Sequence, residues 1–578
     1  MKLIRQAKYF LPAVGFCLFC AAVPHGSANA QTPAMEKPSQ YAIYELDPAP
    51  ALKPQVMDRI ARPLGLEVAK PLREDDAAKQ VMIYTDKERT VRLVFRVASG
   101  TMEIFPNFHE RQKPAPPNER AIDLARKWAE ESGIVRAAGP GIQAGEVTST
   151  GRENFAHDGP RSEAVDVLRT VHFFRQIDGL RVFGKNSILS VDVGAEGVVG
   201  ADFSMRSLVA GRRVPTRIIS SEEALAAFHK RYDEEIDRMK RSHPDYRFEM
   251  APPQLIYYEQ GRRYVQPVYR YIFRFVGPKG VAGDFNRLVP ASVTPPEEIF
   301  SAPRGQTPTK APRRELSKPP EAPATDPVLL GAYIIQNSES GWLDDGWAFL
   351  NDFQTSNLLG QIFFGLPPSQ IAQYYWDEVW LWEADGSIPD NSQYYPGAVN
   401  FAVHEGHGNM WRTATVGDWS KIIELDKITG YGAATGKGEI TNYVLWKGCA
   451  IIPAPGDPYC AEYQSPANWY DVWFTMFQGM RGAYGFRTEM WIDDEAGGPF
   501  GANIGLGSAN LNAWFHATDN SQWDHDSTLN GTDGCPFPSD PGPEYGDAVI
   551  ACGHENDRAY DTGNVPATSC LTIWWQHK

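Results

Sequence analysis

Apolar and polar residues alternate along several segments in the first half of the chain. The clearest is VLRTVHFFRQIDGLRVFGKNSILSVDVGAEGVVGADFSM, residues 167–205, which is interrupted at Asp178-Gly179 and again at residues 194–197. A period of two is typical of strands with one buried face, and glycine beside aspartate favours the turns that join them. We therefore expect antiparallel hairpins in this region.

Two segments between these strands have a helical pattern. AIDLARKWAEESGI, residues 121–134, reaches a helix-ending glycine at Gly133. Ser220 and Glu223 have the spacing of a capping box just before EALAAFHKRYDEEI, residues 223–236. The upstream half should accordingly be an α+β region.

In the second half, apolar runs replace the alternation. Residues 328–336, 399–403 and 443–446 each read as a strand buried on both faces. The last two are followed by His404-Glu405-Gly406-His407-Gly408 and by Lys447-Gly448-Cys449. Reactive groups of an open α/β sheet gather outside the carboxyl ends of its strands. We expect an α/β fold with a candidate site at that edge.

The first thirty residues have the pattern of a secretory signal peptide. Basic residues precede an apolar run at 10–23, and Ala28-Asn29-Ala30 offers a cleavage site. A lipid anchor on Cys20 is the alternative, but the preceding Leu18-Phe19 lacks the small residues that such processing requires. Residues 1–30 thus predict a secreted or periplasmic protein, and no later apolar run is long enough to predict a membrane span.

A proline-rich and charged stretch, residues 301–327, contains almost no large apolar residue. Such a stretch is expected to be an exposed linker that trypsin cuts between Arg304 and Lys318. It separates an N-terminal region, residues 31–300, from a C-terminal domain, residues 328–578.

Charge also divides at the linker. From Val328 onward there are 31 Asp and Glu against 9 Lys and Arg, whereas the upstream residues carry 40 acidic and 47 basic side chains. This balance argues against nucleic acid as a partner of the C-terminal domain. It favours electrostatic docking between the two regions.

Five cysteines remain after signal cleavage, and all lie in the last quarter of the chain. In an oxidising compartment we expect Cys460, Cys535, Cys552 and Cys570 to form two disulfides, in any of about three pairings, and Cys449 to stay reduced. A disulfide between Cys449 and Cys460 is the alternative.

The His407 and Cys449 pair suits nucleophilic catalysis. A thiolate needs a nearby imidazole to accept its proton and later to protonate the leaving amine. Glycine beside each residue lets backbone N–H groups approach the developing oxyanion.

VNFAVHEGHG, followed about forty residues later by YVLWKGC, resembles the caspase-like superfamily of cysteine peptidases, which includes caspases, gingipains, legumain, clostripain and separase. An uncharacterised bacterial family of secreted caspase-like domains is similar as well. The resemblance implies a three-layer α/β/α sandwich over residues 328–578, with catalytic His407 and Cys449 and oxyanion donors at the backbone N–H groups of Gly408 and Cys449. His404 and Glu405 would then be supporting residues. Caspases carry alanine where this chain has Gly448.

Residues 165–275 resemble the propeptides of secreted bacterial peptidases, which act as folding chaperones and inhibitors. The resemblances together imply a secreted cysteine endopeptidase that acts on polypeptides and is made as a precursor, with its own N-terminal region as an inhibitory partner. A non-catalytic caspase-like binding module is the alternative, and so is a stand-alone binding module for the N-terminal region.

Metal chemistry is a further alternative. HEGHG lacks the His-Glu-x-x-His spacing of zinc peptidases, yet His404, His407 and a distant residue such as His554 would form a zinc site for a hydrolase. The acidic stretches WLDDG, WIDDEAGG and WDHDSTLNGTDG are compatible with structural calcium, although none has the twelve-residue loop pattern. The favoured interpretation requires neither cofactor nor metal, and it treats Glu405 and these acidic stretches mainly as solvated.

Overall fold

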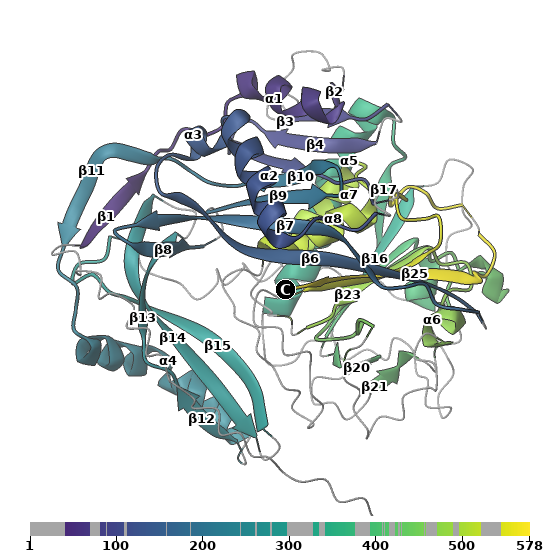
Figure 1. Ribbon diagram of the computed structural model, residues 1–578. Helices are drawn as coiled ribbons and strands as arrows, with labels where there is room; N and C mark the ends of the chain where they lie inside the picture. The colour runs from purple at the N-terminus through teal and green to yellow at the C-terminus, as the bar shows by residue number, and fades with distance from the viewer. Residues whose placement is uncertain are drawn as a thin grey trace, which may run out of the picture. The chain divides into compact units, whose positions relative to one another are not determined.

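The computed structural model describes residues 41–69, 81–296 and 327–578, with gaps at 335–340, 376–393, 415–421, 458–470, 491–495 and 522–544 and several shorter ones, one of which contains His407. The predicted signal peptide and all but the last residue of the predicted linker lie outside the described residues. The described chain is a mixed α/β protein (Figure 1). No helix within these ranges is both long and apolar enough to cross a bilayer.

The N-terminal region is built mainly of strands with a few helices. They are β1 (Tyr41–Leu46), α1 (Pro54–Ala61), β2 (Glu67–Val68), β3 (Val81–Thr85), β4 (Val91–Arg96), β5 (Thr101–Ile104), α2 (Asn118–Glu131), α3 (Ile134–Ala138), β6 (Ile142–Ala156), β7 (Val165–Ile177), β8 (Leu180–Phe183), β9 (Ile188–Gly194), β10 (Gly197–Phe203), β11 (Leu208–Thr216), α4 (Ser221–Ser242), β12 (Arg247–Met250), β13 (Gln254–Glu259), β14 (Tyr264–Gly277) and β15 (Gly280–Pro290).

The C-terminal region alternates strands with helices. Its elements are β16 (Val328–Ile334), α5 (Gly341–Phe364), β17 (Ser369–Tyr375), β18 (Phe401–Glu405), β19 (Gly408–Asn409), β20 (Arg412–Ala414), β21 (Ile422–Glu424), β22 (Tyr443–Lys447), α6 (Asp471–Met476), β23 (Gly482–Phe486), α7 (Gly497–Gly505), α8 (Asn510–Ser521), β24 (Gly546–Ala551) and β25 (Cys570–His577).

The predicted hairpins of the N-terminal region are confirmed. Strands β7 and β8 pair across Asp178-Gly179, where both residues have positive φ, 51° and 79°. That conformation suits a two-residue hairpin turn, and glycine adopts it without steric cost. Strands β9 and β10 pair across the second predicted turn, with Gly194 opposite Gly197.

Both predicted helices of this region also form. Helix α2 buries Ala121, Ala125 and Ala129 against β7 and β9, because small side chains at every fourth position let the helix approach the sheet closely. The capping box before α4 is complete: the N–H of Glu223 donates to Ser220 Oγ at 3.1 Å, and the N–H of Ser220 donates to Glu223 Oε2 at 2.8 Å.

In the C-terminal region, strands β16, β17, β18, β22 and β23 are parallel, and β24 and β25 are antiparallel additions. Neighbouring residues point to opposite faces: Val444 belongs to the hydrophobic cluster that includes α6, and Leu445 to the cluster that includes α5, α7 and α8. The sheet is therefore buried on both sides, as the continuous apolar runs predict.

The two regions share one sheet. Strand β25 pairs antiparallel with β6 over eight residues, from Cys570 opposite Ala156 to His577 opposite Ser149. The sheet therefore continues from β24 and β25 into β6, β7, β9, β10, β5 and β4 (Figure 1).

Side chains reinforce this junction. The ring of Phe108 lies 5.0 Å from that of Trp574 and 5.7 Å from that of Phe515, as measured between centroids. Phe155 meets Phe474 of α6 in the same way at 5.7 Å. The N-terminal region thus contributes to both hydrophobic cores of the C-terminal sheet.

Candidate active site at the carboxyl edge of the parallel strands

Strands β18 and β22 are hydrogen-bonded neighbours that end side by side. Glu405, the last residue of β18, lies opposite Lys447, the last residue of β22. The next N–H along the chain, that of Gly406, donates to the carbonyl of Lys447 at 3.0 Å. The two predicted motifs therefore leave the sheet at the same edge, as the open-sheet argument predicts.

Beyond the strands, the two backbones are in direct contact. A Cβ atom on Gly448 would lie 2.8 Å from the carbonyl oxygen of Gly406 and 3.1 Å from Cα of Gly408. A Cβ atom on Gly408 would lie 3.0 Å from the carbonyl oxygen of Cys449. Glycine suits both positions, because a side chain at either one would force Ile451 or the facing backbone to shift. Gly406 and Gly408 are the chain neighbours of His407, which itself lies outside the described residues.

Cys449 is partly buried in a constrained turn. Its Sγ accepts a hydrogen bond from the N–H of Met490 at 3.5 Å and lies 3.7 Å from the carbonyl oxygen of the same residue. The next residue, Ala450, has a φ of 45°, which side chains adopt at a cost of about 1 kcal/mol or more. Its N–H donates to the carbonyl of Thr488 at 2.7 Å and holds the turn in place.

A buried ion cluster lies directly beneath this turn. The Nζ of Lys447 pairs with Glu405 Oε1 at 3.1 Å and also with Asp345 at the start of α5. The Lys447 and Glu405 side chains are fully buried and that of Asp345 is 2% exposed. Asp345 also accepts the N–H of Gly497, the first residue of α7, at 3.1 Å. The cluster contains two carboxylates and only one ammonium group. The partial positive charge at the N-terminus of α7 helps to balance the additional negative charge.

This cluster corrects two expectations. Glu405 is a buried partner of Lys447 rather than a solvated carboxylate. Asp345, from the acidic stretch WLDDG, is likewise buried in an ion pair. The other two acidic stretches lie largely or wholly outside the described residues.

His404 lies within β18 and is 1% exposed. Its Nδ1 is 3.1 Å from Thr413 Oγ1, and its ring packs on Trp446 with centroids 5.4 Å apart. Burial lowers the pKa of His404 to about 3, so the imidazole is neutral at physiological pH. These contacts anchor β20, which contains Thr413, to the strand that precedes His407.

Among the described residues, neither His404 nor His554 belongs to a group of three side chains close enough to share a metal ion. His554 instead pairs with Asp557, with Nδ1 to Oδ2 at 2.7 Å. The third candidate ligand, His407, lies outside the described residues.

One of the expected disulfides is present. Cys552 and Cys570 are bonded, with Cα atoms 5.5 Å apart, and join the ends of β24 and β25. The other two candidates, Cys460 and Cys535, lie outside the described residues. Cys449 is not part of the Cys552–Cys570 bridge.

Sequence reasoning gave no role to Lys447 or Asp345. A signal was available for Lys447, since a lysine and a glutamate each end an apolar strand, and the strands are neighbours in the sheet. No comparable signal marks Asp345, because its contact depends on how α5 packs.

The chain matches a family model described as "Domain of unknown function (DUF6345)" over residues 368–532. No curated protein matches it. Among solved structures, it is similar to an uncharacterized protein from Eubacterium rectale ATCC 33656, at 12% identity and a TM-score of 0.28, over 45% of this chain and 86% of that one.

Proposed function

We propose that this protein is a secreted cysteine endopeptidase of the caspase-like type, with Cys449 as nucleophile and His407 as acid and base. The observation that carries the proposal is the contact between the two strand ends. Gly406 and Gly408, on either side of His407, pack against Gly448, which directly precedes Cys449. A histidine and a cysteine therefore adjoin glycines whose backbones are in contact, at the carboxyl edge of a parallel sheet.

The chemistry follows from these roles. His407 takes the thiol proton, and the Cys449 sulfur attacks the scissile carbonyl carbon to give a tetrahedral oxyanion. The backbone N–H groups of Gly408 and Cys449 are the proposed oxyanion donors. The C–N bond breaks as the imidazolium protonates the leaving amine. Water, deprotonated by the same imidazole, then cleaves the thioester and releases the acid product and the thiol.

The resemblance to caspase-like peptidases gains support from two features. In this chain, the histidine and the cysteine each come after an apolar strand. The two strands, β18 and β22, are adjacent and parallel. The alanine that caspases carry before the cysteine is replaced here by Gly448, and the close carbonyl of Gly406 gives the physical reason.

We propose that the N-terminal region acts first as an intramolecular folding partner. The eight-residue pairing of β6 with β25 supports this role, because β6 covers an edge that would otherwise expose unpaired backbone groups. An inhibitory role is a separate proposal, tested by comparing activity before and after the linker is cut.

The test is labelling of the purified mature protein with a peptidyl acyloxymethyl ketone, which alkylates an activated thiol. Mass mapping should locate the label on Cys449. His407→Ala should abolish labelling, whereas the matched control His554→Ala, at a histidine with its own aspartate partner, should preserve it.

Labelling of another residue, or undiminished labelling in His407→Ala, would refute the dyad. A fully folded protein that neither reacts nor hydrolyses peptides would instead be a non-catalytic module. Hydrolysis that survives Cys449→Ala but stops with a chelator would indicate the zinc alternative.

A further inference from the structure

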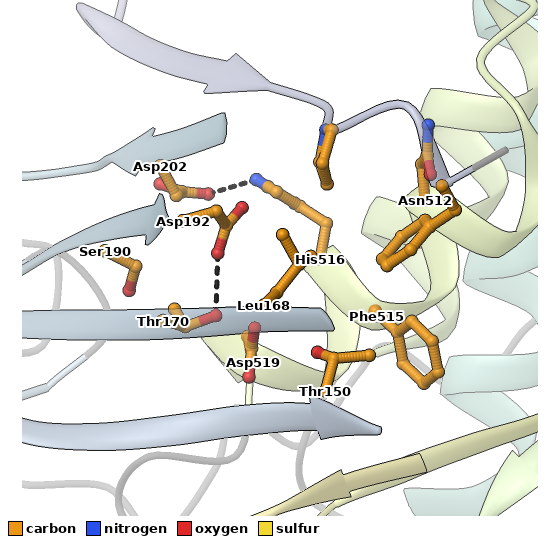
Figure 2. A pocket seen from close by; sticks show the side chains of 12 residues that line it. Thr150, Leu168, Thr170, Ser190, Asp192, Asp202, Asn512, Phe515, His516 and Asp519 are labelled. Atoms are coloured by element: carbon orange, nitrogen blue, oxygen red, sulfur yellow. Dashed lines mark hydrogen bonds and ion pairs between the residues drawn. The ribbon is translucent and has the colours of Figure 1, made fainter. Parts of the chain in front are cut away.

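A second cluster of ionisable side chains lies where the N-terminal strands meet α8. Figure 2 shows His516 of α8 extending toward Asp202 of β10, with Asp192 of β9 beside them. The Nε2 of His516 lies 2.6 Å from Asp202 Oδ2. Donor atoms of Glu103, Asp202 and His516 all lie within 4.8 Å of one another.

These side chains are largely removed from water. The side chain of Glu103 is 12% exposed, that of Asp202 10% and that of His516 9%. They come from β5, β10 and α8, so rigid elements of both regions hold them. Such positions fix ligand geometry better than loops do.

A small cavity adjoins the cluster. Its volume is ≈ 20 Å³, which is room for about one water molecule or one ion. Asp192, Asp202, Asp519 and His516 line it. Asn512 lines it too, is 2% exposed, and its Oδ1 has no hydrogen-bond partner among the residues that the structure describes. A buried acceptor oxygen without a protein donor is satisfied by a water molecule or by a cation beside it.

Charge in the cluster is unbalanced. Four carboxyl side chains lie in the cluster or line its cavity, and two basic groups, Arg96 and His516, lie beside them. Arg96 Nη1 forms an ion pair with Glu103 Oε2 at 2.8 Å, and Arg96 Nη2 donates to Asn503 Oδ1 at 3.2 Å. Asp192 Oδ1 accepts from Thr170 at 2.7 Å. With every group ionised, an acidic excess would remain, and a buried excess of one sign is relieved either by protonation of a carboxyl group or by a bound counter-ion. The carboxylates are, in chain order, Glu103, Asp192, Asp202 and Asp519.

We propose that this cluster binds one divalent transition-metal cation, of the zinc or manganese type, which joins the N-terminal strands to α8. His516, with a neutral imidazole, and Asp202, as a carboxylate, would be two of the ligands. Glu103 would be the third. An imidazole together with carboxylates favours such ions over calcium or magnesium, which prefer oxygen alone. Two ligand atoms bound to one ion lie about 3–4 Å apart. Small side-chain rotations would therefore bring the ligand atoms of Glu103, Asp202 and His516, which now lie within 4.8 Å of one another, into binding distance of one ion.

The proposal does not depend on the peptidase assignment. The experiment uses the full mature chain after removal of metals with a chelator, followed by addition of Zn²⁺, Mn²⁺ or Co²⁺. We expect one equivalent bound per chain, a higher melting temperature and, with Co²⁺, the visible absorption of a protein-bound ion.

His516→Asn and Glu103→Gln, two ligand changes on different elements, should each weaken binding about 10- to 100-fold. If one variant does not fold, the other decides. His554→Asn is the matched control, since it changes another His–Asp pair and should leave binding unchanged. Absence of bound metal in the wild type, or full affinity in a folded ligand variant, would overturn the proposal.

Discussion

The parallel and antiparallel halves of the shared sheet place their buried polar groups differently. Strands β18 and β22 are buried along their whole length, and their charged residues Glu405 and Lys447 sit at the carboxyl ends. Strand β7 instead carries His172 within the sheet, where its two ring nitrogens lie 2.9 Å from Thr148 and Ser190 of the adjacent strands.

The difference follows from topology. Parallel strands with helices on both faces are mostly apolar along their length, so their charged groups and reactive motifs gather at the carboxyl edge. Antiparallel strands tolerate polar residues along their length when neighbouring strands satisfy them. Under the proposed function, the parallel half contains the reaction centre and the antiparallel half is its scaffold.

The largest expected effect tests where the reaction centre lies. Cys449→Ala should lower peptide hydrolysis by roughly three orders of magnitude or more, and His407→Ala by a comparable factor. The double variant should lose little more than either single one, because the two act as one unit. Steady-state kinetics on folded variants measures this.

His404 provides the contrast within the same motif. Its contacts are to Thr413 and Trp446, so His404→Gln should retain appreciable turnover in the protein that folds. Full activity in Cys449→Ala would remove the mechanism. Equal loss of activity in the His404 and His407 variants, together with zinc bound to the protein, would show that these histidines form a metal site.

The next effect tests the ion cluster at the strand ends. Lys447→Met leaves Glu405 and Asp345 buried without their ammonium partner, and loss of one member of a buried ion pair costs about 3–5 kcal/mol. Urea denaturation monitored by tryptophan fluorescence should show the loss. Lys437→Met, at an exposed lysine, is the matched control.

Replacing all three charges separates electrostatics from packing. Lys447→Met combined with Glu405→Gln and Asp345→Asn should recover much of the lost stability, because no uncompensated charge remains. Wild-type stability in the single variant would mean that the cluster contributes nothing to holding the two motifs together.

A smaller effect concerns the scaffold half. Glu259, at the end of β13, is fully buried, and neither carboxylate oxygen has a hydrogen-bond partner among the described residues. Burial raises the pKa of Glu259 to about 8, although Arg175 and Arg206 lower it. The folded state therefore holds a proton that the unfolded state releases above its ordinary pKa. Stability should fall as the pH rises from about 4.5 to about 8.

Glu259→Gln removes that dependence. It should be more stable than the wild type at pH 8, by an amount on the order of a few kcal/mol, with little difference near pH 4. Thermal melts across this pH range measure it. Glu249→Gln, at a side chain 52% exposed, is the control and should follow the wild type. A wild-type profile for Glu259→Gln would contradict the assignment.

Local patterns predicted much of this fold. The capping box at Ser220 and Glu223 and the turn at Asp178-Gly179 depend only on neighbours in the chain. The apolar runs likewise predicted β16, β18 and β22, since a strand buried on both faces must be apolar throughout.

Contacts between distant residues were beyond such patterns. No local feature pairs β6 with β25, which lies more than 400 residues later. Overall charge was a poor guide to the junction, because the basic N-terminal region contributes acids there. Asp166 meets His577 at 2.8 Å, and Asp202 meets His516 at 2.6 Å. Side chains at an interface are chosen by their immediate partners, whereas net charge sums over the whole surface.

The smallest expected effect concerns the link between the two halves. Limited trypsin treatment should cut between Arg304 and Lys318, since residues 301–327 have little apolar content to protect them. We expect the two fragments to stay together, because the β6–β25 pairing and the contacts of Phe108 and Phe155 do not involve the linker. Size-exclusion chromatography of the cut protein should give one peak that contains both fragments, with a melting temperature close to that of the intact chain. Urea should separate them.

Early cuts beyond Val328 would place the boundary elsewhere, and separate elution in native buffer would show that the shared sheet depends on the covalent connection. Activity that rises on cutting while the fragments remain associated would locate any inhibition in the linker rather than in the scaffold strands.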